Sequence, residues 1–208
     1  MTPANLLPDF FTIPSDRFVI RPMLRGDASP SLSPWIEDEN AAAMLNTPRR
    51  SWTVAQQEEY FAKHEGPSRR RILGIFPKDA KDPIGLFILK LNPKHAVVVV
   101  SHLIGDTAWR GSNTSSEASR ALYGYLFNTL GYAKAKCNVN PGNKSMLWLL
   151  YSFAWRKEAR LSKHLRLAAS GERSDLLVFG LLADDWRARQ EALRLASADQ
   201  ARQKTGAA

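Results

Sequence analysis

The chain has 208 residues, with 44% hydrophobic and 24% charged side chains and a formal net charge of +9. This length suits one domain that buries about two thirds of its unfolded surface, and the longest apolar run, residues 96–100, is too short to span a bilayer. The composition therefore predicts a globular protein outside the membrane. Its positive charge favours an anionic partner such as a phosphorylated cofactor, a nucleic acid or a ribosomal surface.

The N-terminus and the cysteine content bear on cellular location and redox chemistry. Residues 1–11 lack the charged stretch, apolar segment and small-residue cleavage site of a secretory signal, so we expect a cytoplasmic protein. Cys137 is the only cysteine, which excludes an internal disulfide and a cysteine-based metal cluster. We expect its thiol to be buried and inert in a strand, and the histidine spacing predicts no metal site.

The N-terminal third is expected to contain one strand and two helical regions. Residues 17–22 alternate polar and apolar side chains and end at a proline, which predicts a first strand. Two prolines interrupt residues 27–45, so a broken first helix is expected there. Thr53 and Gln56 fit a capping box, which predicts a helix that ends near His64.

The rest of the chain alternates apolar runs with helical periodicity. Residues 71–76 and 84–90 flank a turn with two prolines and predict a hairpin. Residues 96–104 form an unbroken β-branched run, typical of a central strand covered on both faces. Further strands are expected at residues 133–140 and 176–182, and helical segments at 115–130, 144–153 and 184–206.

Residues 109–118, which read Trp-Arg-Gly-Ser-Asn-Thr-Ser-Ser-Glu-Ala, follow the strongest predicted strand and open a predicted helix. Thr114 and Glu117 fit a second capping box and predict a helix that begins at Ser115. A helix start presents unpaired amide groups and the positive end of the helix dipole, and small residues before it let an anion approach. Arg110 would add a planar donor fork for phosphate. A capped helix after a tight turn, with no ligand, is the alternative.

This loop resembles the cofactor loop of the GNAT superfamily, which in one branch reads Arg-Gly-x-Gly-x-x-x-Glu-Ala. Arg110, Gly111, Glu117 and Ala118 fall on that pattern, and Asn113 stands in place of the second glycine. Asn113 would either block approach to the backbone or occupy the left-handed region that asparagine tolerates.

Matches further along the chain resemble the branch of ribosomal-protein N-terminal acetyltransferases. They are Leu130-Gly131, Asn143, Asp175 with Phe179, and Trp186. The resemblance covers about residues 10–190. It implies one domain over residues 1–190, with a helical or disordered tail over 191–208. The fold it implies is an α/β mixed, mostly antiparallel twisted sheet of six or seven strands, flanked by helices and splayed between its fourth and fifth strands.

The resemblance also implies an N-acetyltransferase that uses acetyl-CoA as co-substrate, requires no metal and acts on a primary amine by direct attack. The amine would belong to a protein N-terminus or a small molecule. The residues implied in cofactor binding are Leu103, Ile104, Arg110, Gly111, Ser112, Asn113, Thr114, Ser115, Ser116 and Asn143.

Acyl transfer needs a neutral amine, a donor for the developing oxyanion and a proton source for the leaving thiolate. A backbone amide within residues 103–105 would serve the oxyanion. His102, late on its strand, is the candidate general base, with a hydrogen-bonded strand histidine as the alternative. Tyr151 or Ser145 would supply the proton, although the tyrosine of other branches aligns with Leu150. Asn143 would contact the pantetheine arm, cap the following helix, or do both.

Two alternatives stay open. Asn113 and other replaced glycines are also consistent with a degenerate domain that binds coenzyme A or a partner without catalysis. The net charge of +9 and six tryptophans are consistent with a protein that binds nucleic acid or the ribosome, although no nucleic-acid-reading motif is recognisable. We expect no membrane partner, and a homodimer is one open possibility for the assembly.

Overall fold

The computed structural model describes residues 7–66 and 68–205, and its centre is an eight-stranded sheet. The strand order is β1-β2-β3-β4-β5-β6-β8-β7, and only β5 and β6 pair in parallel. The strands are β1 (Ile13–Pro14), β2 (Phe18–Pro22), β3 (Arg70–Pro77), β4 (Gly85–Asn92), β5 (Val97–Ile104), β6 (Lys134–Val139), β7 (Arg156–Arg166) and β8 (Arg173–Leu182). The prediction of a mixed, mostly antiparallel sheet is confirmed.

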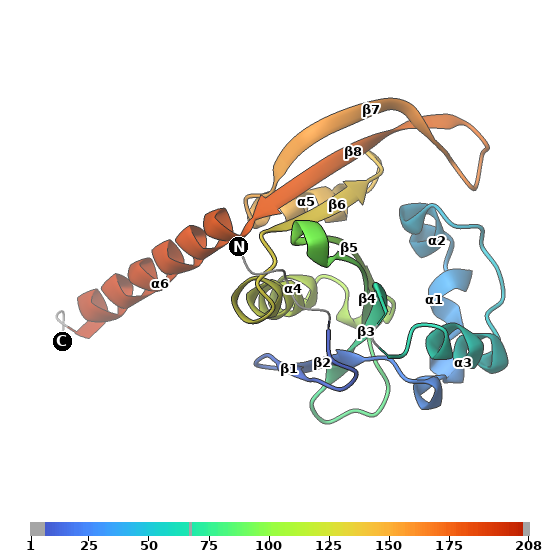
Figure 1. The fold of residues 1–208 in the computed structure, drawn as a ribbon, viewed down its shortest axis with the longest axis horizontal. Helices are drawn as coiled ribbons and strands as arrows, with labels where there is room; N and C mark the ends of the chain where they lie inside the picture. Colours follow the sequence, from blue (N-terminus) through green and yellow to red (C-terminus); the bar gives the residue numbers. More distant parts are fainter. Residues whose placement is uncertain (1–6, 67, 206–208) are drawn as a thin grey trace.

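Helices cover both faces of this sheet (Figure 1). They are α1 (Pro34–Glu37), α2 (Glu39–Leu45), α3 (Val54–Ala62), α4 (Thr114–Gly124), α5 (Lys144–Ser152) and α6 (Ala183–Thr205). A π-helical turn, η5 (Tyr125–Thr129), continues α4. The prolines break the first helical region into short pieces, as predicted, and Thr53 and Gln56 form the expected capping box of α3.

The alternation of side chains along each strand builds one apolar cluster on each face. On β3, Leu73 and Ile75 point into the larger cluster, which also contains Ala118 and Leu122 of α4. Ile72 and Phe76 point the other way, into a smaller cluster with Trp35 of α1 and Phe61 of α3. Because successive strand residues face opposite sides, one apolar strand can anchor helices on both faces.

The strand β5 is fully covered on only one face, although Leu103 on the other face packs against the smaller cluster. Val98 and Val100 are fully buried, whereas Val97 and Val99 are partly buried and Ser101 is exposed. The prediction of a strand covered on both faces is therefore wrong. An unbroken apolar run has no polar residue to mark an open face, so periodicity alone could not reveal it.

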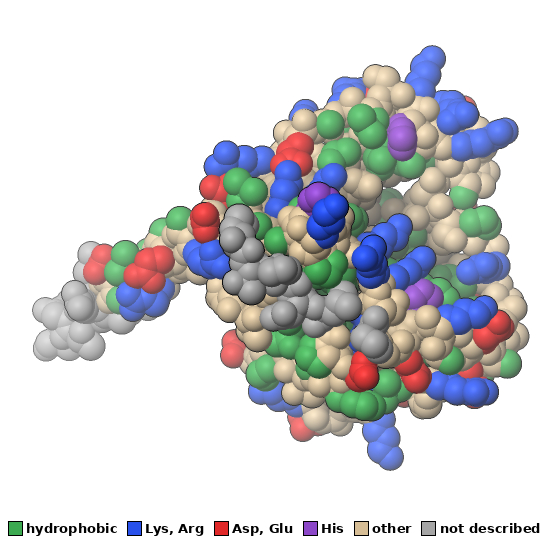
Figure 2. All heavy atoms as spheres, viewed as in Figure 1, with side chains coloured by type: hydrophobic (Ala, Val, Ile, Leu, Met, Phe, Trp, Pro, Cys, Tyr) green, Lys and Arg blue, Asp and Glu red, His purple; other side chains and the backbone are tan. Residues whose placement is uncertain are grey.

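The edge strand β7 was not predicted. Its sequence carries six charged residues and a histidine, and its side chains are exposed except for Ala159 and Leu165. Antiparallel pairing with β8 holds it in place, with irregular register between Lys157 and Ala159 and between Leu161 and Leu165. Figure 2 shows Lys and Arg side chains gathered at the tip of this hairpin. A charged edge with bulges is a common protection against unwanted strand pairing.

Arg71 is an exception to the expected surface placement of the basic residues. Its side chain is buried, and its guanidinium donates to the backbone carbonyls of Leu7, Pro8, Asp9 and Gly66. Arg71 thereby ties the first described residues of the chain to β3. Its neighbours Arg69 and Arg70 are exposed, so only the third arginine of this basic run is buried.

The C-terminal helix α6 extends away from the sheet (Figure 1). Trp186, in its first turn, is buried against the larger cluster, and the helix continues past residue 190 to Thr205. Residues 206–208 of the expected tail lie outside the described residues. Within the described ranges, none of the helices has the length and apolar character needed to cross a membrane.

Candidate active site

The strands β5 and β6 part after three paired positions. Val97, Val98 and Val99 pair with Lys134, Ala135 and Lys136, and β5 then continues to Ile104 with only β4 beside it. Beyond this point β6 remains paired with β8. A wedge-shaped gap therefore opens between β5 and β6, as the resemblance implied.

The backbone of β5 presents amide groups to this gap. The Ala96 carbonyl accepts hydrogen bonds from Ala133 and Lys134, so even-numbered residues direct their backbone toward β6. The register with β4 is continuous from Val97 to Ile104, which preserves the alternation. The amides of His102 and Ile104 thus face the gap, whereas that of Leu103 faces β4. Within the expected range 103–105, the Ile104 amide therefore faces the gap, and the Leu103 amide is turned away from it.

The loop between β5 and α4 leaves its amide groups free. In the part of the chain that the structure describes, the amides of residues 111–116 donate no hydrogen bond, and the first α4 bond runs from Glu117 to the Asn113 carbonyl, at 3.0 Å. Gly111 has φ +80°, and a Cβ built on it would meet no atom within 4 Å. These features form a cradle of amide donors at the positive end of a helix.

Asn113 adopts the left-handed conformation, with φ 60° and ψ 7°, and its side chain makes no capping hydrogen bond. Asparagine is among the residues that tolerate this region, so it can replace the second glycine of the motif without altering the turn. Its side chain does not accept hydrogen bonds from the first amides of α4. Those amides stay available to a ligand.

The predicted capping box at Thr114 and Glu117 does not form. The helix begins at Thr114, one residue earlier than predicted, and the Thr114 hydroxyl lies 2.9 Å from that of Ser112. The Glu117 carboxylate instead binds Ser15 and Arg17. A partner about 100 residues away in sequence cannot be found by a local motif, which explains the error.

The Arg110 side chain is already bound to the protein. Its guanidinium donates to the carbonyls of Ile104 and Gly105, at 3.0 and 3.1 Å, and forms an ion pair with Asp38 at 2.7 Å. This arrangement differs from the expected phosphate fork, because three N–H donors of Arg110 bind the end of β5 and the start of α2. The ion pair also helps lower the pKa of Asp38, chiefly through the Arg110 hydrogen bond.

The His102 ring is neutral near pH 7. Its Nε2 atom is buried and has no hydrogen-bond partner among the described residues, and burial lowers its pKa to about 4 because desolvation disfavours the imidazolium. The expectation that His102 titrates near neutral pH is therefore wrong, and with it the main argument for a general base. The ring packs against Phe87 on β4.

The helix α5 carries the remaining predicted residues. The Asn143 side chain accepts a hydrogen bond from the Met146 amide at 3.0 Å, which confirms its role as a helix cap. Ser145 is exposed in the first turn, and Tyr151 is 58% exposed, with its ring edge-on to Phe179. Leu150, at the position of the tyrosine in other branches, is fully buried and has no ionisable group.

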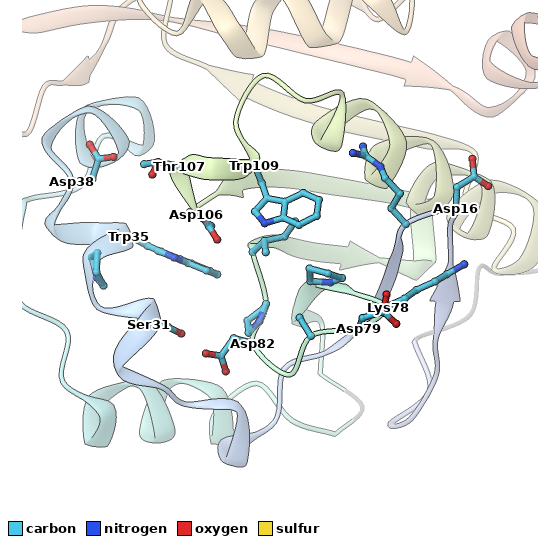
Figure 3. A pocket seen from close by; sticks show the side chains of 17 residues that line it. Asp16, Ser31, Trp35, Asp38, Lys78, Asp79, Asp82, Asp106, Thr107 and Trp109 are labelled. Atoms are coloured by element: carbon cyan, nitrogen blue, oxygen red, sulfur yellow. The ribbon is translucent and has the colours of Figure 1, made fainter.

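A pocket of about 840 Å³ lies beside the segment that links β5 to the loop. Its lining includes Gly105, Trp35 and Trp109, and Figure 3 shows the two indoles directed toward the same space. Of its five aspartates, Asp38 binds Arg110 and Asp106 accepts a hydrogen bond from the Ala108 amide. Over the described ranges, His, Cys, Asp and Glu side chains form no group of three suited to a metal ion.

Sequence reasoning missed Arg17 and Asp38. Arg17 binds Glu117 and also the Ser112 carbonyl, and Asp38 binds Arg110, so both contact the loop or its flanks from distant parts of the chain. No local signal marks either residue. Only the tertiary structure brings Arg17, which precedes β2, and Asp38, the N-cap of α2, to this end of the sheet.

A family model described as "Acetyltransferase (GNAT) domain" matches residues 17–151. A relative from Bacillus licheniformis, described as an uncharacterized N-acetyltransferase p20, is 25% identical over 179 residues, which are 84% of this chain and 98% of the relative.

Two solved structures share the fold. A ribosomal-protein-S5-alanine acetyltransferase from Vibrio fischeri has a TM-score of 0.70 and 16% identity, over 85% of this chain and 98% of its own. A spermidine N-acetyltransferase from Vibrio cholerae, in complex with CoA and spermine, has a TM-score of 0.72 and 18% identity, over 82% of this chain and 98% of its own. At these identities the likeness establishes the shared fold.

Proposed function

Because this chain belongs to the GNAT acetyltransferase family, we propose that it transfers an acetyl group from acetyl-CoA to a primary amine by direct attack. The thioester of acetyl-CoA supplies the activated acyl group. The single observation that carries the proposal is the cradle of unpaired amides at residues 111–116, which opens beside the gap between β5 and β6.

The cradle fits a pyrophosphate in chemistry and in space. Free amide donors and the positive end of the α4 dipole both favour a negatively charged ligand. The open space at the Cβ position of Gly111 and the left-handed turn at Asn113 leave the backbone accessible. We assign cofactor binding to the backbone of residues 111–116, with Arg110 holding the end of β5 in place.

The amides of His102 and Ile104 are the proposed donors for the oxyanion. They face the gap and have no strand partner there, so a carbonyl oxygen could accept from either one without displacing a ladder hydrogen bond. Donors fixed by a strand need no rearrangement as charge develops, which is the basis of this kind of stabilisation. His102 thus contributes its backbone, and its neutral side chain contributes packing.

The proton donor to the thiolate stays a prediction, with Tyr151 and Ser145 of α5 as its two candidates. Both side chains are exposed on the helix that Asn143 caps, and Asn143 itself is proposed to reach the pantetheine arm. Substitution of Tyr151 by Phe and of Ser145 by Ala removes each hydroxyl with little change in shape. A loss of kcat in one variant would assign the role.

The acceptor is proposed only as a primary amine. The two solved relatives share this fold, yet one is described as acting on the alanine of a ribosomal protein and the other on spermidine. The fold thus accommodates acceptors of very different size. A screen of peptides and polyamines with labelled acetyl-CoA would identify the class.

The cofactor site is tested by thermal unfolding with and without acetyl-CoA. A ligand at a hundredfold excess over its Kd should stabilise the protein by about 2.7 kcal/mol. Gly111→Trp should abolish the shift, because the indole would fill the cradle. Gly131→Trp is the matched control, since Gly131 also has a positive φ, at +75°, and open space at its Cβ.

A shift with Gly131→Trp but not with Gly111→Trp supports the site. The absence of any shift in the unaltered protein would contradict the proposed function. Binding of acetyl-CoA without transfer to any amine would instead favour a degenerate domain that binds the cofactor alone.

A further inference from the structure

Arg17 bridges the cofactor loop and the first turn of α4. Its Nη2 donates to the Ser112 carbonyl at 3.0 Å, and its Nε pairs with Glu117 Oε2 at 2.7 Å. The Arg17 amide and the Ser15 hydroxyl both donate to Glu117 Oε1, each at 2.7 Å. One arginine beside β2 therefore contacts both the loop, at Ser112, and the first turn of α4, at Glu117.

Aromatic packing holds this arginine in place. The Arg17 guanidinium lies 4.8 Å from the centroid of the Phe18 ring and 6.0 Å from that of Trp109. Phe18 and Trp109 pack edge to face, with centroids 5.5 Å apart. The turn that precedes the loop thus rests on β2, directly after Arg17.

Glu117 places a negative charge close to the proposed anion site. It is the fourth residue of α4, and its side chain is only 15% exposed. Burial raises the pKa of Glu117, but hydrogen bonds from the Arg17 amide, the Arg17 side chain and Ser15 outweigh this effect, so the pKa is lowered. Glu117 is therefore ionised at neutral pH, where its charge opposes an incoming pyrophosphate unless a cation compensates it.

We infer that Arg17 is a positioning residue for coenzyme A binding. It holds the loop through Ser112 and neutralises Glu117 beside the anion cradle. This inference rests on the proposed function, because it assigns Arg17 to the same cofactor site. Arg17 acts through the loop and α4, and the backbone amides of residues 111–116 remain the ligand donors.

The inference predicts that removal of the Glu117 charge restores the CoA affinity that is lost when Arg17 is replaced. Arg17→Met should raise the Kd for CoA and the KM for acetyl-CoA about tenfold, in the range of charge effects at helix termini, with kcat little changed. Glu117→Gln alone should bind CoA as tightly as the unaltered protein, or more tightly, because a charge that opposes the ligand is removed. The double variant should regain most of the affinity lost in Arg17→Met.

A purely structural bridge predicts the opposite pattern. Each single variant would then weaken binding, and the double variant would bind no better than Arg17→Met. Arg21→Met is the matched control, because Arg21 lies on β2, which begins directly after Arg17, pairs with Asp27 through two hydrogen bonds of 2.8 Å and stacks on Phe76. Arg21→Met should lose stability and leave the Kd for CoA unchanged.

The experiment measures the Kd for CoA by titration calorimetry on the full chain at low salt, with circular dichroism to check folding. Arg17→Lys keeps the charge but loses the planar fork, so it should bind with intermediate affinity, and it replaces Arg17→Met if that variant does not fold. Equal affinities for the Arg17 and Arg21 variants, or no rescue in the double variant, would overturn the inference. Failure of the unaltered protein to bind CoA would overturn the proposed function and this inference together.

Discussion

The imidazole of His102 stacks on the ring of Phe87, the residue directly opposite it on β4, with ring centroids 4.6 Å apart and an interplanar angle of 15°. This contact places the histidine in an apolar setting on the same face as the larger cluster. A neutral ring suits that setting, and a charged ring would lose its hydration without gaining a partner.

This burial predicts a loss of stability in acid. The pKa of His102 is about 4 in the folded state, against 6.5 for the unperturbed side chain, so the unfolded chain binds its proton first as pH falls. Above pH 6.5 the ring is neutral in both states, so His102 does not lower the unfolding free energy. As the pH falls toward 4, protonation of the unfolded chain lowers the unfolding free energy by roughly 3 kcal/mol at most. His102→Leu should remove this part of the acid-induced loss of stability. Urea unfolding of both proteins at pH 7.5, 5.5 and 4 measures it. Equal pH dependence in both proteins would contradict the prediction.

The Trp35 indole lies so close to Gly105 that we expect any larger residue at this position to destabilise the protein. A Cβ built on Gly105 would overlap the buried Trp35 indole, so Gly105→Ala should cost about 1–3 kcal/mol of unfolding free energy. Chemical denaturation gives the value. Gly26→Ala serves as the control, because a Cβ there meets nothing within 4 Å. If the Gly105 and Gly26 variants were equally stable, the indole would have to move freely.

Replacement by methionine should lower the stability of the protein much more at Arg71 than at its neighbour Arg70. Arg71→Met would leave the buried Leu7 carbonyl and the partly buried carbonyls of Pro8 and Asp9 without this donor, and it should destabilise the protein by roughly 3 kcal/mol. Arg70 is exposed, and among the described residues its side chain binds only the Tyr60 hydroxyl, at 3.3 Å, so Arg70→Met should change the stability by about 0.5 kcal/mol or less. Thermal unfolding of the two variants, side by side, tests whether burial decides the outcome.

The tip of the β7–β8 hairpin is fastened to α2 by Asn46. Its side chain donates to the Arg166 carbonyl at 3.0 Å and accepts from the Ala168 amide at 2.9 Å. Asn46→Gly keeps the left-handed backbone, φ 49°, but removes both bonds. Amide hydrogen exchange over residues 162–174 should then become faster, with no change at β3 and β4. Unchanged exchange at the tip would show that the pairing with β8 holds it without Asn46.

Much of the fold could be predicted from local patterns. The capping box at Thr53 and Gln56, the apolar runs of β3 and β4 and the β-branched run of β5 each indicate an element that the structure contains. The strand β7 could not be predicted, because its charged sequence becomes a strand only through pairing with β8. Intrinsic strand preference is weak compared with such tertiary context.

The candidate site also has features that local sequence predicts and features that only the structure shows. The small residues before α4 and the position of the loop after a strong strand indicated an anion site, and the left-handed Asn113 was one of two conformations expected. The actual partners of Arg110 and Glu117, which are Asp38 and Arg17, come from the first 40 residues of the chain.

The sequence by itself determined that a helix start, whose first amides have no partner within the helix, would follow a glycine-containing turn. Only the tertiary structure decided which charges surround those donors and whether His102 could ionise. Ion pairs and desolvation depend on distances between residues far apart in sequence, and the folding of the sheet sets those distances.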